Sequence, residues 1–248
     1  PATTAAALAR LIAQRAARGE APLTFAVVFP FSMHNYALRY WLAQAGIDPD
    51  RDVRLVVTPP PRMVEQLRAG EVDGICVGAP WSSVAVLDGL GKIAFWTSQF
   101  WPAGPDKVLG VAEAFADRDP PRLQALLRAL VQAQAWADEP GHRAELTELL
   151  ARPDHVGAAA AAIARALDRE LVFHRDGAGL PRLEHARWLL GQMRRWNQID
   201  DSVDQRALAA RVYRPDLARG ALAAFAAAET AKPAPLFDGQ AFDAGLNA

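Results

Sequence analysis

The sequence predicts an α/β protein with mainly parallel strands, and three observations support this class. Between residues 22 and 120, short apolar runs typical of buried strands alternate with helical patterns across short loops. From about residue 120 onward, helical patterns follow one another without strands between them. Hydrophobic residues make up 51% and charged residues 22% of the 248 residues, which is enough apolar material for a folded core.

Each predicted strand is a short apolar run that closes at proline or glycine, the residues that most often end regular structure. Three strands are expected at residues 23–29, 53–57 and 72–77. Two further candidate strands lie at residues 93–97 and 107–111. The expected helices show apolar residues at helical spacing and comprise residues 2–19, 34–45, 62–69, 79–87, 122–137, 142–151, 155–170, 181–196 and 204–212.

This pattern divides the chain into four segments by composition. Residues 1–21 are expected to form a linking helix, and residues 22–120 an α/β lobe. Residues 121–227 are expected to form a helical C-terminal region that begins behind a pair of prolines, which suit a helix start. Residues 228–248 have little periodicity and predict a surface tail.

Several classes of function are excluded by composition and motif. The 27 basic and 28 acidic residues give a net charge of −1, which argues against non-specific binding to nucleic acid. The single cysteine, Cys76, cannot form an internal disulfide, and the five histidines lack the i, i+4 pairing of a helical zinc site. Nucleophile-elbow, P-loop and dinucleotide-binding glycine motifs are absent, and no apolar run is long enough to span a membrane. We therefore expect no metal, no cofactor and no catalytic residue.

Three residues at the ends of predicted strands form a candidate site for a small anion. His34 follows the first strand, Gly78 follows the third, and Lys107 follows a loop rich in turn-forming residues. Ligands of open α/β sheets bind outside the carboxyl ends of the strands, where backbone N–H groups are available. A lysine would supply charge, and a histidine and a glycine N–H would supply direction. The alternatives are a helix-capping or surface histidine, an ordinary turn glycine and a solvated lysine.

At these residues the sequence resembles a known family. The segments FPFSMH, RYWLAQAGIDP, PPPRMV, CVGAPW and PDKVLGV together resemble nitrate- and bicarbonate-binding proteins of ABC transporters and their cytoplasmic nitrate-sensor relatives. The similarity extends over roughly residues 5–220. It implies the two-lobed, type II fold of periplasmic solute-binding proteins. The chain would correspond to the second lobe, with a parallel-rich sheet, and to the helical C-terminal return.

The resemblance also implies a ligand. His34 falls on the family's cleft histidine, and Gly78 on the glycine whose N–H meets the anion. Lys107 falls on a position that is lysine in nitrate binders and acidic in bicarbonate binders, so the expected ligand is nitrate or nitrite. Met33 and Ala79 depart from the family pattern, which has a small or hydroxyl residue and an acidic residue there.

Partners and compartment follow from the resemblance as two alternatives. A transport protein would act with ABC transporter membrane subunits, whereas a sensor would act with an RNA-binding antiterminator. The HRD motif at residues 174–176 and the segment GPDKVLG favour the sensor. They therefore slightly favour a cytoplasmic location over a periplasmic or membrane-associated one. The family further implies another lobe segment before Pro1. The remaining alternatives are a solute-binding-like enzyme that makes thiamine pyrimidine with a reactive histidine, and a fragment without a ligand of its own.

Overall fold

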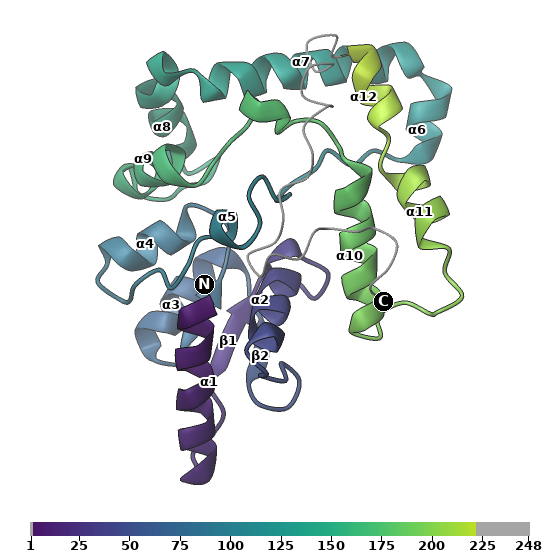
Figure 1. Ribbon diagram of the computed structural model, residues 1–248. Helices are drawn as coiled ribbons and strands as arrows, with labels where there is room; N and C mark the ends of the chain where they lie inside the picture. Colours follow the sequence, from purple (N-terminus) through teal and green to yellow (C-terminus); the bar gives the residue numbers. More distant parts are fainter. Residues whose placement is uncertain (1, 222–248) are drawn as a thin grey trace. The chain divides into compact units, whose positions relative to one another are not determined.

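The computed structural model describes residues 2–221, which form two compact units (Figure 1). Among these residues, unit 1 comprises residues 2–102 and 147–171, and unit 2 comprises residues 103–146 and 172–221. These units are defined by contacts between residues, whereas the four segments expected from the sequence are defined by composition. The tail expected at residues 228–248 lies outside the described part of the chain.

The centre of unit 1 is a three-stranded parallel sheet of order β2-β1-β3. Its strands are β1 (Thr24–Val27), β2 (Arg54–Val57) and β3 (Gly74–Cys76). Val27 is level with Val57 on one side and with Cys76 on the other, so the carboxyl ends of all three strands lie at one edge. The three strands expected from the sequence are confirmed with shorter bounds.

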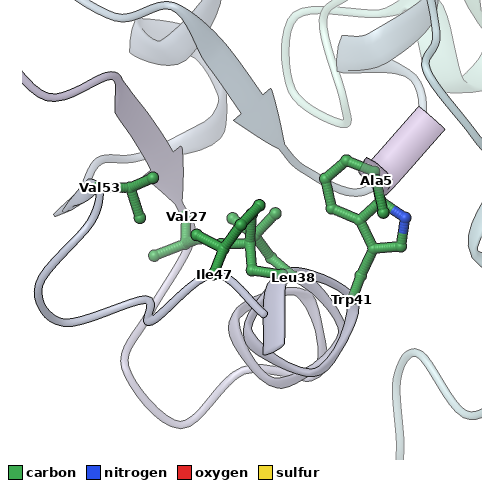
Figure 2. Close-up of a cluster of buried hydrophobic side chains, with 7 residues drawn as sticks. Ala5, Val27, Leu38, Trp41, Ile47 and Val53 are labelled. Carbon is green, nitrogen blue, oxygen red and sulfur yellow. The ribbon is translucent and has the colours of Figure 1, made fainter. Parts of the chain in front are cut away.

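Two helices, α1 (Ala2–Ala17) and α2 (Met33–Gln44), cover one face of the sheet. Figure 2 shows the cluster of buried side chains at this face. Strand residues alternate between faces, so β1 sends Val27 to this cluster. The helices contribute residues at helical spacing, and the loop after α2 contributes two more. The fully assembled cluster comprises Ala5, Val27, Leu38, Trp41, Leu42, Ile47 and Val53.

The opposite face of the sheet packs against α3 (Pro60–Ala69). Met63 of α3 is fully buried against Ala26 of β1 and Val72. The helix ends at Gly70, whose φ of 70° lies in the left-handed region that glycine adopts without strain. Helices on both faces explain why the strands read as continuous apolar runs.

The remaining helices of unit 1 come from two stretches of sequence. The first holds α4 (Trp81–Leu87) and α5 (Thr97–Phe100), and the second holds α9 (Ala160–Arg169). The strand expected at residues 93–97 is wrong, because residues 91–96 are irregular. Phe95 packs against Trp41 with ring centroids 4.6 Å apart, so this apolar run is buried through its side chain without a strand partner.

Unit 2 is helical, as expected for this part of the sequence. The strand expected at residues 107–111 is wrong, because this stretch is irregular and exposed. The long helix α7 starts with two prolines behind Asp119, whose carboxylate accepts a hydrogen bond from the Arg122 N–H at 3.1 Å. The helices are α6 (Glu113–Arg118), α7 (Pro120–Asp138), α10 (Leu183–Arg195), α11 (Gln205–Val212) and α12 (Pro215–Ala221), with α8 (Arg143–Ala151) running from unit 2 into unit 1.

A buried carboxylate fixes the end of α7 to a later segment of unit 2. Asp138 accepts hydrogen bonds from the N–H groups of Phe173, His174 and Arg175 at 2.7–3.2 Å, and its ion pair with the Arg175 guanidinium measures 3.0 Å. Burial on its own raises the pKa of Asp138, but these donors and the arginine charge outweigh it and lower the pKa. The carboxylate therefore stays charged in the folded protein.

Candidate functional site

The topology of unit 1 places a switch point at the carboxyl edge of its sheet. In the order β2-β1-β3, the connection after β1 leads to α2 on one face, and the connection after β3 leads to α4, which packs beside α3 on the other. The two connections diverge between β1 and β3, which makes this a topological switch point. Ligands of doubly wound sheets bind at such points. His34 and Gly78 lie on these two connections.

His34 is half-buried in the first turn of α2, and the start of this helix is firmly held. The Ser32 hydroxyl caps the helix by accepting a hydrogen bond from the Asn35 N–H at 3.1 Å, and it donates to the Phe29 carbonyl at 2.8 Å. The buried Asn35 amide donates to the Pro30 carbonyl at 2.7 Å. These bonds leave little freedom to the first turn of α2, which carries the histidine.

Gly78 is half-buried in the loop between β3 and α4. Its carbonyl accepts a hydrogen bond from the Trp81 N–H at 3.3 Å, and the Ala79–Pro80 peptide bond is cis. The Gly78 N–H donates to no acceptor within residues 2–221. A half-buried N–H group without a protein acceptor is available to a ligand.

Cys76 joins the two connections directly. Its thiol donates a hydrogen bond to the His34 carbonyl at 3.3 Å, which brings the end of β3 against the start of α2. Burial raises the pKa of this thiol to about 12, so the sulfur stays protonated and is a poor nucleophile at neutral pH. The cysteine is therefore a structural contact at the switch point.

Lys107 lies in unit 2, on the exposed irregular segment before α6. Its ammonium pairs with the neighbouring Asp106 carboxylate at 2.5 Å, and the lysine side chain remains 74% exposed. The structure thus brings His34 and Gly78 to one edge of unit 1 and places Lys107 in the other compact unit. The sequence pattern did not reveal Glu170, Ser82 and Ser83, which form hydrogen bonds beside the Gly78 loop, because the serines lie 88 and 87 positions from Glu170 and so give no local signal.

A hollow elsewhere in unit 1 does not fit an anion. It has a volume of about 130 Å³ and lies beside Leu23, at the amino-terminal edge of the sheet. Its two arginines already face carboxylates, with Arg15 2.8 Å from Glu20 and Arg51 2.9 Å from Asp52. In the described part of the chain, no three His, Cys, Asp or Glu side chains gather in a way that would hold a metal ion. Within the same residues, no helix combines the length and apolar character needed to cross a bilayer.

Comparison with known proteins identifies the family. A model of the NMT1-like family matches residues 2–151, more than half of the chain. The chain belongs to the NMT1-like family. Its structure is also similar to the crystal structure of the periplasmic nitrate-binding protein NrtA from Synechocystis PCC 6803. The TM-score is 0.85 at 28% sequence identity, and the match covers 96% of this chain and 66% of that one. This similarity confirms the resemblance and the solute-binding α/β fold class predicted from the sequence.

Two curated relatives of this chain have names that refer to nitrate. The nitrate/nitrite binding protein NrtA of Synechococcus elongatus is 34% identical over 242 residues, or 89% of this chain and 55% of that protein. The nitrate import ATP-binding protein NrtC of Synechocystis is 37% identical over 209 residues, or 78% of this chain and 31% of that protein. The chain thus spans between about a third and about half of these relatives. It contains no P-loop, so the match to NrtC does not involve that motif.

Proposed function

We propose that this chain belongs to a non-catalytic solute-binding protein for a small oxyanion, nitrate or nitrite. His34 and Gly78 are its proposed direct contacts at the sheet edge, and Lys107 is its proposed cation. An imidazole donates a ring N–H in either protonation state, and a glycine N–H donates without a side chain in the way. Both suit a planar monovalent anion whose oxygens accept in-plane hydrogen bonds.

The single observation that carries the proposal is that His34 and Gly78 lie on the two connections that diverge at the switch point of the sheet. The Cys76–His34 hydrogen bond supports it by holding the two connections together. The half-buried Gly78 N–H, which meets no acceptor within residues 2–221, supports it further. Lys107 enters the proposal through the family resemblance and through charge complementarity with a monovalent anion.

Transport is the better supported biological role. The relatives named above are a nitrate/nitrite binding protein, a nitrate import protein and a periplasmic nitrate-binding protein. We therefore propose ABC transporter subunits as the partners. The slight preference for a cytoplasmic sensor with an antiterminator partner gains no support from these relatives. A transport protein would deliver its anion to the membrane subunits by a change of conformation.

Enzymatic synthesis of a thiamine pyrimidine has less support. Cys76 is the only cysteine in the sequence, and its thiol is protonated and hydrogen-bonded within the fold. Binding without chemistry is therefore the function that these residues support.

Calorimetric titration with nitrate, on the natural gene product with any sequence that flanks the chain, tests the proposal. We expect saturable binding, and a loss of roughly 10- to 100-fold in affinity for His34→Ala. His155→Ala is the matched control, because His155 is exposed and its ring lies 3.2 Å from the neighbouring Asp154 carboxylate, far in sequence from the proposed site. Absence of nitrate and nitrite binding by the unmodified protein would refute the proposal. Equal affinity of His34→Ala and His155→Ala would remove His34 from the site.

A further inference from the structure

Glu170 ties α9 to the first turn of α4 within unit 1. Its carboxylate accepts hydrogen bonds from the Ser83 hydroxyl at 2.9 Å and from the Ser82 hydroxyl at 3.1 Å. Ser83 is fully buried, and Glu170 is half-buried at the C-terminal end of α9. The carboxylate therefore holds two successive residues of α4 from a stretch of chain 87 residues away.

The environment of this carboxylate is one that a merely solvated surface residue would not have. Burial raises the pKa of Glu170, while the two hydroxyls and the charge of Arg165 act in the opposite direction. Partial desolvation of a carboxylate costs free energy, which the fold offsets with hydrogen bonds. Such an arrangement is expected where the geometry of the bonded partner matters.

The partner, α4, depends on outside support. It has only seven residues and no side-chain cap at its N-terminus, so its own backbone hydrogen bonds give it little stability. It begins three residues after Gly78, and the Trp81 N–H bonds back to the Gly78 carbonyl at 3.3 Å. A shift of the first turn of α4 would therefore pull on the Gly78 carbonyl, and through the backbone dihedral angles of Gly78 it would turn the N–H of the same residue.

We propose that Glu170 is a positioning residue, which holds the first turn of α4 through Ser82 and Ser83 so that the Gly78 N–H keeps its direction. This role deepens the proposed anion function and depends on it for the ligand. The effect on the backbone of the Gly78 loop does not depend on any ligand. Two measurements therefore separate failure of the positioning role from failure of the anion function.

Amide hydrogen exchange on the ligand-free protein tests the mechanical part. In Glu170→Ala we expect exchange to become about tenfold faster in residues 78–84. Glu170→Gln should restore slow exchange, because a Gln amide can accept from one serine hydroxyl and donate to the other oxygen. Asp138→Ala removes a hydrogen-bonded carboxylate from unit 2, so any faster exchange that follows from its loss of stability should not be concentrated in residues 78–84. Ser82→Ala, which removes one bond only, replaces Glu170→Ala if that variant does not fold.

Nitrate titration of the same variants tests the functional part. We expect Glu170→Ala to bind nitrate roughly 2- to 30-fold more weakly, and both Glu170→Gln and Asp138→Ala to bind near the level of the unmodified protein. If the unmodified protein binds no nitrate but residues 78–84 loosen in Glu170→Ala, the anion function fails and the positioning of the loop stands. Unchanged exchange in residues 78–84 of Glu170→Ala, or unchanged nitrate affinity beside a binding unmodified protein, overturns the proposal for Glu170.

Discussion

The sheet edge of unit 1 and the segment around Lys107 in unit 2 differ in how firmly each is held. At the sheet edge, a helix cap, a buried amide and a thiol hydrogen bond fix the loop of His34. Around Lys107, the backbone is irregular and the side chains of Val108 and Leu109 are exposed. The lysine's partner there is its own neighbour in sequence, Asp106.

This difference shows that a directed hydrogen-bond donor and a charged side chain have separate structural requirements in an anion site. A hydrogen-bond donor must be aimed to within a fraction of an ångström, so it is built on rigid elements. A charge acts over several ångströms and needs only to be near the anion, so a loop can carry it. We therefore expect variants of the sheet edge to alter geometry and stability, and variants of Lys107 to alter affinity alone.

Reversal of the loop charge should have the largest effect. Lys107→Glu replaces the proposed attraction for the anion by repulsion and should weaken nitrate binding by about 100-fold or more, as measured by calorimetry. Its melting temperature should stay close to that of the unmodified protein, because the side chain is exposed. Lys92→Glu, another exposed loop lysine, is the matched control. Equal affinity of the two variants would show that Lys107 takes no part in the site.

Loss of the Asp138 charge should give the largest effect on stability. Asp138→Asn weakens hydrogen bonds to three N–H groups and leaves Arg175 without its partner carboxylate. We expect a loss of roughly 2–4 kcal/mol in the free energy of unfolding, measured with urea. A loss below about 0.5 kcal/mol would mean that the contact is not maintained in solution.

The same carboxylate predicts a pH dependence. Because the folded-state pKa of Asp138 is lowered, its contribution is fully present above the unfolded value, which is about 3.9. The contribution disappears as the pH falls through the lower folded value. Urea unfolding between pH 6 and pH 2 should therefore show a smaller acid loss in Asp138→Asn than in the unmodified protein. Parallel curves would contradict a lowered pKa.

A glycine in each unit tests packing at a smaller scale. In β3, a Cβ on Gly74 would lie 2.8 Å from the Phe25 ring of the neighbouring strand. Gly74→Ala should therefore cost roughly 1–3 kcal/mol of stability. In unit 2, a Cβ on Gly179 would lie 2.7 Å from the end of the flexible Gln134 side chain, which can move aside. The melting temperature of Gly74→Ala should be well below that of Gly179→Ala. The reverse order would contradict the packing of the sheet.

The smallest effect is expected at Cys76. Cys76→Ser keeps a donor for the His34 carbonyl, so nitrate affinity should change less than about threefold and stability by about 1 kcal/mol or less. Because burial raises the pKa of the thiol, the folded protein should react slowly with thiol reagents at pH 7. Rapid modification without unfolding would show that the thiol leaves the His34 carbonyl in solution.

Local patterns predicted the three strands and most helices, and the candidate residues at strand ends stay a prediction. Apolar runs closed by Pro30 or Gly78 are strong signals, and the prolines before α7 mark a helix start well. The strands predicted from two other apolar runs were wrong. Phe95 is buried against Trp41 without a strand partner, and the run after Lys107 is exposed. The contacts of Glu170 and Asp138 join residues far apart in sequence, so no periodicity or spacing could have revealed them.

An NMR titration with nitrate tests most directly the central claim, that the Gly78 N–H binds the anion. It follows the Gly78 amide resonance in the isotope-labelled natural gene product. Donation of its N–H to an anion should shift this resonance in a saturable way, with the same midpoint as the heat of binding. Lys107→Glu should abolish the shift at the same nitrate concentrations. A Gly78 amide that stays in place while the protein binds nitrate would contradict the proposed site.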